Sequence, residues 1–259
     1  MKTIVLSVIL LGFSLLASAQ ADMVFQLNNS LPQGLMGSRM ANAWGMSGQL
    51  LYSFPESRFA LGGEIGINSY GCQTSRQTYR FQDGSSTETD VSVGNDFAQF
   101  NVVGRADLRA GGSLIPYVTA KVGYLHYWTN LNIADPEDAD GCHPLENTAL
   151  LKDGTLAGTL GAGMRWDMSG LFKKMRQRKY WLDVSAEYMT GGRVRFMNVN
   201  LPPATGHQHH APAGVADPFS ARFINPQTQV VHEHHVGDVY NAAVEKISVR
   251  FGFVLRLGE

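Results

Sequence analysis

Residues 246–257 read Lys-Ile-Ser-Val-Arg-Phe-Gly-Phe-Val-Leu-Arg-Leu. Apolar side chains recur at every second position, which is the period of a β-strand and not of a helix. The intervening positions carry Lys246, Ser248, Arg250, Gly252, Val254 and Arg256, so the second face is largely cationic. This strand suits a soluble barrel or sandwich with its apolar face inward. It equally suits an outer-membrane barrel with its apolar face toward lipid and a polar interior. The rest of the sequence has to distinguish the soluble fold from the membrane barrel.

The first residues have the pattern of a secretory signal peptide. Lys2 supplies the positive charge, residues 4–16 the apolar stretch, and residues 17–19 (Ala-Ser-Ala) a small-residue cleavage site. Cleavage after Ala19 and after Ala21 both fit. We therefore expect residues 1–21 to be the signal peptide and residues 22–259 the mature domain. The apolar stretch is short for a spanning helix, and no later segment is long and apolar enough, so membrane insertion has to use strands.

The charge balance and the cysteine count narrow the function classes. The chain has 21 Lys and Arg against 22 Asp and Glu, which argues against a nucleic-acid-binding protein because such proteins normally carry a basic excess. There are two cysteines, Cys72 and Cys142. In an exported chain, an isolated pair predicts a disulfide rather than a metal site.

Alternation with a period of two recurs along the mature chain. It predicts eight strands, at residues 23–29, 40–54, 59–69, 97–109, 116–128, 155–167, 180–189 and 246–257. The connections after the second, fourth and sixth strands are short. Those at residues 71–96, 129–154 and about 190–242 are long and polar, and the first is intermediate. Short turns at one end and long loops at the other are typical of bacterial outer-membrane barrels, whose short turns face the periplasm.

Aromatic residues gather near the strand ends, as expected for belts at the two lipid interfaces. The belt near the short turns would contain Tyr52, Phe54, Phe59, Tyr117, Trp166 and Tyr180, and the belt near the long loops Tyr70, Phe97, Tyr124, Trp128 and Tyr188. A soluble lipocalin-like barrel or sandwich explains neither these belts nor the loop asymmetry. We therefore predict an all-β fold in the bacterial outer membrane: an eight-stranded antiparallel up-and-down transmembrane β-barrel with short periplasmic turns and long extracellular loops.

Two segments carry a resemblance to a known family. Residues 246–257 and residues 180–196 (Tyr-Trp-Leu-Asp-Val-Ser-Ala-Glu-Tyr-Met-Thr-Gly-Gly-Arg-Val-Arg-Phe) resemble the outer membrane protein β-barrel domain family, which includes eight-stranded OmpA/OmpX-like barrels. Chains of this kind often end on an aromatic residue that resembles an assembly signal. This chain ends Leu-Gly-Glu, so Phe251 and Phe253 would have to take that role.

In a membrane barrel the polar faces line the interior. We expect an ion-pair network in the lumen, formed by Glu64, Arg105, Asp107, Arg109, Lys121, Arg165, Asp167, Asp183, Glu187 and Arg250, with Lys246 and Arg256 on the same faces. An eight-stranded barrel is just wide enough for side chains to fill it, and unpaired buried charges are costly. These charges should pair and plug the lumen, which argues against a general porin.

The expected extracellular loops contain two candidate sites. Cys72 and Cys142 fall in the second and third long loops and can tie them together, with two free thiols as the alternative. The last loop carries two His-x-His-His clusters, formed by His207, His209, His210, His232, His234 and His235. Neutral imidazoles at this spacing can bind zinc or copper, although the spacing matches no standard structural zinc site. A flexible loop with solvated histidines is the other interpretation, in which no cofactor is bound.

The sequence favours a non-enzymatic protein. His126 lacks the neighbours of a lipid-modifying site, and no serine lies in a nucleophile-elbow motif. We expect a role in surface binding, in envelope structure or as a subunit of a larger outer-membrane assembly. The alternatives are a rim-located lipid-modifying enzyme, and a narrow channel or metal-capture protein. The expected partners are outer-membrane lipid and proteins at the extracellular loops or at the basic periplasmic turn, residues 168–179.

Overall fold

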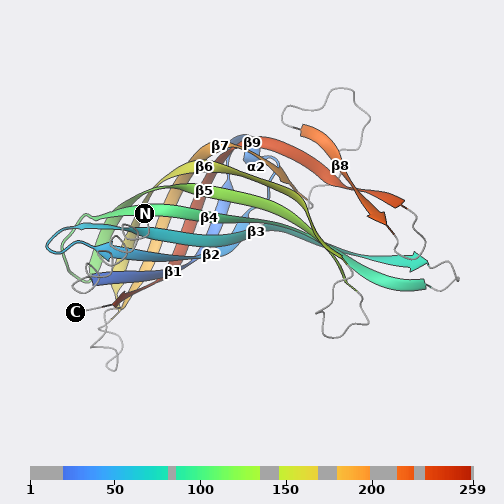
Figure 1. Ribbon diagram of the computed structural model, residues 1–259. Coiled ribbons are helices and arrows are strands. Elements are labelled where there is room, and N and C mark those ends of the chain that lie inside the picture. Colours follow the sequence, from blue (N-terminus) through green and yellow to red (C-terminus); the bar gives the residue numbers. More distant parts are fainter. Residues whose placement is uncertain are drawn as a thin grey trace, which may run out of the picture.

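The computed structural model describes residues 20–80, 86–134, 146–168, 180–198, 215–224 and 231–257. The described chain is almost entirely β-strand, with one short helix, α2 (Figure 1). No helix in these ranges has the length and apolar character needed to cross a bilayer. The elements are β1 (Gln20–Pro32), α2 (Gly34–Gly37), β2 (Ala43–Ser53), β3 (Phe59–Arg80), β4 (Ser86–Asp107), β5 (Leu114–Ala134), β6 (Glu146–Asp167), β7 (Tyr180–Met197), β8 (Val215–Ile224) and β9 (Val231–Leu257).

Eight of these strands close into a barrel. The hydrogen-bonded order is β1-β2-β3-β4-β5-β6-β7-β9, and β1 pairs with β9 to complete the circle. Every pairing is antiparallel, and the closing register runs from Ala21↔Leu257 to Pro32↔Lys246. Both ends of the described chain therefore lie at the same, periplasmic end of the barrel (Figure 1). The predicted eight-stranded antiparallel barrel is confirmed.

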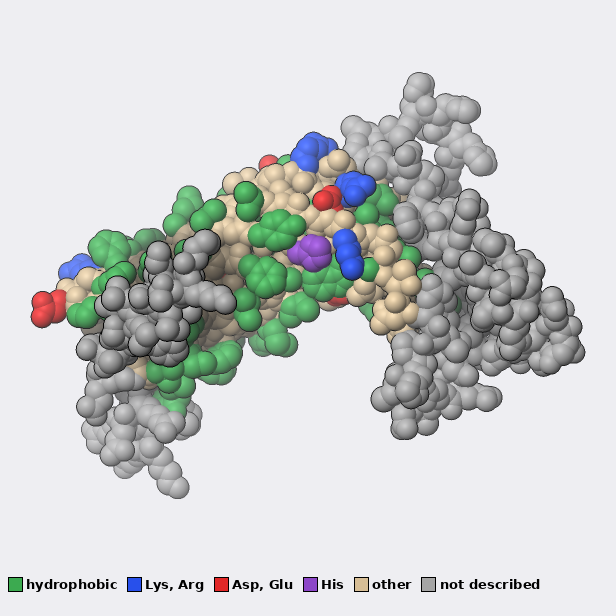
Figure 2. Space-filling model, viewed as in Figure 1, with side chains coloured by type: hydrophobic (Ala, Val, Ile, Leu, Met, Phe, Trp, Pro, Cys, Tyr) green, Lys and Arg blue, Asp and Glu red, His purple; other side chains and the backbone are tan. Residues whose placement is uncertain are grey.

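The barrel has its apolar side outward. Leu160 is 69% exposed and Ile65 is 64% exposed, whereas Arg165 and Arg250 inside are at most 1% exposed. Figure 2 shows apolar side chains over the outer surface of the barrel. This arrangement buries charge and exposes hydrocarbon, the reverse of a soluble protein, and it fits a barrel whose surroundings are acyl chains.

The predicted long loops are partly wrong. The segments expected as loops at residues 71–96 and 129–154 continue β3, β4, β5 and β6, which stay paired out to Arg80↔Ser86 and Ile133↔Glu146. The third expected loop contains the end of β7, all of β8 and the start of β9. We call the outer parts of β3–β6 the first arm (residues 70–80, 86–96, 129–134 and 146–154). The outer parts of β7, β8 and β9 are the second arm (residues 193–197, 215–224 and 231–243).

The arms extend beyond the outer end of the barrel, where α2 connects β1 to β2 (Figure 1). Pairing between β6 and β7 ends at Ala157↔Gly191, so the two arms are separate sheets beyond that point. Beyond the bilayer neither face of a strand meets lipid. The apolar alternation therefore stops, and a polar paired strand resembles a loop in the sequence.

Glycine is required where neighbouring strands approach closely. A Cβ built on Gly252 of β9 would lie 1.9 Å from the carbonyl oxygen of Phe25 and 2.7 Å from the Cα of Gln26, both in β1. A Cβ built on Gly48 of β2 would meet nothing within 4 Å. The seam that closes the barrel therefore depends on the missing side chain of Gly252.

We expect Gly252→Ala to lower the free energy of unfolding by about 1–3 kcal/mol, because backbone atoms of β1 have to move. Gly48→Ala is the matched control and should change it by less than about 0.5 kcal/mol. Urea-induced unfolding in lipid vesicles, followed by tryptophan fluorescence, measures both. Equal stability of the two variants would contradict this view of the seam.

Candidate functional site

The middle of the barrel interior holds a closed group of two carboxylates and two cations. Glu64 on β3 contacts Lys121 Nζ at 2.6 Å and Arg250 Nη1 at 2.7 Å. Glu187 on β7 contacts the same two groups, at 2.6 Å and 3.0 Å. All four side chains are at most 3% exposed. Because each carboxylate meets both cations, the group is electrically balanced. We call it the central cluster.

Amides complete the surroundings of Glu64. Gln49, Gln99 and Asn101 each donate a side-chain N–H to its carboxylate, at 2.8, 2.7 and 2.9 Å. With Lys121 and Arg250, donors from β2, β4, β5 and β9 converge on one residue of β3. A buried charge is tolerated when it is both paired and hydrogen-bonded, as here.

A second ionic group lies nearer the periplasmic end. Asp22 on β1 pairs with Arg105, with Arg165 at 3.3 Å and with Arg256 at 2.8 Å. Asp107 pairs with Arg165 and with Arg105. We call this group the periplasmic cluster. It contains three arginines and two aspartates, and Asp22 is fully buried.

Asp183 on β7 lies apart from the salt bridges described here. Its carboxylate accepts hydrogen bonds from Gln26 at 2.6 Å and from the Tyr117 hydroxyl at 3.0 Å. Below the periplasmic cluster, a cavity of about 710 Å³ opens at the short turns, and Arg58, Asp107, Arg109, Arg165, Trp181 and Arg256 are among the residues that line it.

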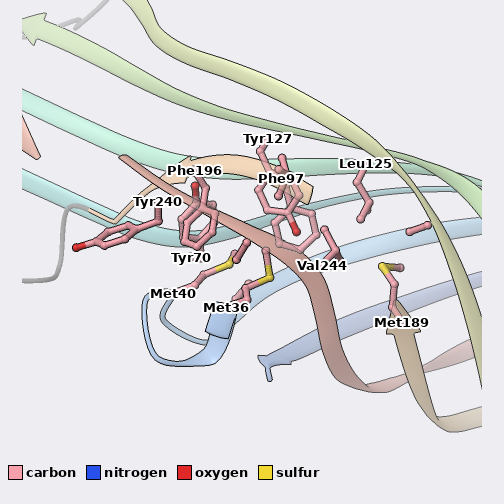
Figure 3. Close-up of a cluster of buried hydrophobic side chains, with 14 residues drawn as sticks. Met36, Met40, Tyr70, Phe97, Leu125, Tyr127, Met189, Phe196, Tyr240 and Val244 are labelled. Atoms are coloured by element: carbon pink, nitrogen blue, oxygen red, sulfur yellow. The ribbon is translucent and has the colours of Figure 1, made fainter. Parts of the chain in front are cut away.

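The outer end of the lumen is apolar and aromatic (Figure 3). Helix α2 lies at the mouth, and Met36 from it is 1% exposed. The rings of Phe97 and Tyr127 stack with centroids 4.9 Å apart, and Tyr70 packs against both. We call this group the outer cap; it consists of Met36, Met40, Ala43, Tyr70, Phe97, Leu125, Tyr127, Ala157, Met189, Val194, Phe196, Tyr240, Ala242 and Val244.

Lys246 marks the boundary between the outer cap and the ionic interior. Its Nζ lies 3.9 Å from the centroid of the Phe97 ring, and it has no hydrogen-bond partner among the described residues. The ring face stabilises the ammonium group by a cation–π interaction. Lys246 therefore couples the cap to the charged layer beneath it.

The structure distributes the expected lumen residues unevenly. Glu64, Lys121, Glu187 and Arg250 meet in the central cluster, and Arg105, Asp107 and Arg165 meet in the periplasmic cluster. Arg109 is exposed beyond the end of β4, and Asp167 lies at the end of β6 beside the cavity. Asp22 was not among the expected lumen residues, because it lies beside the expected cleavage site, just before the strand predicted at residues 23–29.

The predicted aromatic belts need correction. Tyr70, Phe97 and Tyr117 are each at most 5% exposed and point into the barrel. Phe54, Phe59, Trp166, Tyr124 and Tyr188 are exposed on the outer surface, as expected for belts. Nearness to a strand end suggested that all of them faced lipid. The two-residue alternation shows which of them face inward. Tyr117 lies on the same face of its strand as the buried Lys121, and Phe97 lies on the same face as the buried Asn101.

The expected metal and disulfide sites fall largely outside the described residues. His207, His209, His210 and Cys142 lie outside them, and for His232, His234 and His235 only the backbone of β9 is described. Cys72 is exposed on β3, in the first arm and not in a loop. No group of three or more His, Cys, Asp or Glu side chains in the described part of the chain is arranged to hold a metal ion. Both sites stay predictions.

Breaking the central cluster should destabilise the barrel. In Glu64→Gln, one carboxylate has to serve two cations, and we expect a loss of about 3–5 kcal/mol in the free energy of unfolding. Adding Lys121→Met restores charge balance, so the double variant should lose less than the sum of the two single variants. Glu56→Gln, in the exposed turn between β2 and β3, is the control. Urea unfolding in vesicles measures all four; additive losses would contradict the cluster.

Comparison with known proteins gives similar folds at low scores. No family model and no curated protein matches the sequence. Neisserial surface protein A aligns over 93% of this chain and 97% of its own, with 8% identity and a TM-score of 0.46. OprG from Pseudomonas aeruginosa aligns over 93% and 97%, with 10% identity and a TM-score of 0.42. Ail from Yersinia pestis aligns over 92% and 97%, with 11% identity and a TM-score of 0.34.

The geometry of the molecule itself indicates a membrane barrel. Eight antiparallel strands close on themselves, their outer surface is apolar and their charges are paired inside. The chain is an eight-stranded antiparallel β-barrel with the inside-out polarity of a bacterial outer-membrane barrel.

Proposed function

We propose that this barrel is a non-conducting membrane anchor that holds the two arms outside the cell for binding. The observation that carries the proposal is the filling of the lumen. Three successive layers fill it: the central cluster and the outer cap consist of buried side chains, and in the periplasmic cluster Asp107 and Arg256 are partly exposed to the cavity below. An interior filled in this way supports a structural role for the barrel and leaves the arms as the parts available to a partner.

The paired strands of the arms support a role in binding a partner. A loop of the same length would lose much conformational entropy on binding, whereas a strand paired along its length is already ordered. In the first arm, β3 and β4 remain in register from Gly71↔Asn95 to Arg80↔Ser86. Among the described elements, β3 has no paired strand on its outer edge beyond Ser69, and β6 has none beyond Ala157, where β7 contacts it only through Arg195 and Asp153. Such edges are suited to a protein partner that adds a strand.

A non-enzymatic role agrees with the position of His126. Its ring stacks between Tyr124 and Trp128, with centroid distances of 6.4 and 5.7 Å, on the outer face of β5. A general base has to contact the group whose proton it takes, and this imidazole is held among aromatic rings facing the membrane boundary. If lipid A from cells with and without the gene differs in mass, the alternative of a lipid-modifying enzyme is correct.

The filled lumen predicts that the purified protein forms no stable pore. We expect no lasting conductance steps when it is reconstituted in a planar lipid bilayer, because ions would have to pass both clusters and the outer cap. A general porin added to the same bilayer is the positive control. A stable, large-conductance state would contradict the proposed anchor and favour a channel.

Shortening the first arm should abolish partner binding without unfolding the barrel. Cys72 and Gly94 are paired in register, so residues 73–93 can be replaced by an Asn-Gly turn that keeps the β3–β4 hairpin. We expect full-length protein to capture an outer-membrane or surface partner in a pull-down, and the shortened protein to lose it. Arg58→Gln, at the periplasmic end, is the control and should keep the partner. Capture by the shortened variant at the full-length level would contradict the role of this arm.

A further inference from the structure

Three cations gather at the outer end of the barrel, on its external face. Lys152 on β6, and Arg193 and Arg195 on β7, are all exposed and lie on neighbouring strands. Asp153 ties the two strands together, since the backbone N–H of Arg195 donates to its carboxylate at 2.8 Å. Arg193 and Arg195 are two residues apart on β7, about 7 Å, and Lys152 directly precedes Asp153, which contacts Arg195. The three cations therefore lie around the contact between Asp153 and Arg195, and we call them the rim cluster.

The protein holds the two arginines of the rim cluster in place. The Arg193 guanidinium donates to the side-chain oxygen of Asn241 at 3.1 Å and to its backbone carbonyl at 2.6 Å. Arg195 Nε lies 3.4 Å from the Asp153 carboxylate, and its side chain remains 55% exposed. Asp153 thus neutralises Arg195. Among the described residues, no carboxylate pairs with Lys152 or Arg193, so the cluster keeps an excess of positive charge.

The rim cluster lies directly beyond the apolar surface. Lys152 is in register with Trp128 of β5, the last ring of the Tyr124–His126–Trp128 row. Below that row the outer face is hydrocarbon, with Val122, Leu156 and Leu160 each more than 60% exposed. Figure 2 shows basic side chains next to the apolar surface toward the outer end of the barrel. Tyrosine and tryptophan belong at the headgroup level of a bilayer, so the cations stand at the height of the outer-leaflet headgroups.

We propose that the rim cluster binds the phosphorylated headgroup of an outer-leaflet glycolipid whose acyl chains lie on the apolar face below. Two features select this ligand. Guanidinium groups bind phosphate through paired N–H donors, and held side chains lose little entropy in doing so. The continuity between the cations, the aromatic row and the apolar face fits a molecule that is anionic at one end and hydrocarbon at the other. This inference depends on the barrel fold and not on the proposed role of the arms.

The test uses full-length protein in a neutral detergent, titrated with bisphosphorylated lipid A and followed by native mass spectrometry. Lys152→Gln/Arg193→Gln removes two charges and leaves the Asp153–Arg195 contact in place. Arg58→Gln/Arg109→Gln removes two exposed charges at the periplasmic end and is the matched control. We expect the rim variant to bind lipid A about thirtyfold more weakly, from about fivefold per charge. The control should bind like the unchanged protein.

Two further arms identify the chemistry that is recognised. Dephosphorylated lipid A should bind as weakly to the unchanged protein as lipid A binds to the rim variant. Inorganic phosphate, at concentrations equal to that of the lipid, should not displace it, because it lacks the acyl chains. Equal loss in the rim and control variants, or undiminished binding of the dephosphorylated lipid, would overturn the site. Displacement by inorganic phosphate would overturn its assignment to a lipid.

Discussion

The buried pairing of Glu64 and Glu187 with Lys121 and Arg250 is the constraint on which the barrel depends. With lipid outside, every polar face of the eight strands has to point inward, and the charges it carries have no water to solvate them. The central cluster pairs four of them across strands that are far apart in the sequence. It also fixes which strands face each other, since each partner sits on a different strand: β3, β5, β7 and β9. The apolar outer surface and the paired interior therefore require each other.

Much of this was predictable from alternation alone. The two-residue period placed Glu64, Lys121, Glu187 and Arg250 on inward faces before any contact was known, and it gave the strand count of the barrel. It could not give the pairings, because register between strands depends on three-dimensional contacts. The outer cap was missed for a different reason. Tyr70 and Phe97 lie near strand ends, where aromatic residues usually meet lipid headgroups, but their parity turns them into the lumen beneath α2.

In the arms, the hydropathy pattern no longer identifies strands. Inside the bilayer, one face meets lipid and the other the interior, so the sequence alternates. Beyond it, both faces of β3, β4, β5 and β6 can be polar, and a polar strand cannot be distinguished from a loop by hydropathy. The arms lie in water and not in lipid. Their strands therefore do not alternate in hydropathy, and they are also accessible to partners. A filled barrel with ordered outer strands is a rigid support, and the rim cluster lies where that support leaves the membrane.

The inside-out arrangement can be tested directly by spin labels on its outer face. In a Cys72→Ser/Cys142→Ser background, single cysteines at Val122 and Leu160 carry nitroxide labels, and the protein is reconstituted in lipid vesicles. Both residues are more than 60% exposed on the barrel wall. Electron paramagnetic resonance should find these labels accessible to oxygen, which dissolves in acyl chains, and shielded from a water-soluble nickel complex. Labels relaxed more strongly by the nickel complex than by oxygen would contradict a barrel whose apolar surface faces lipid.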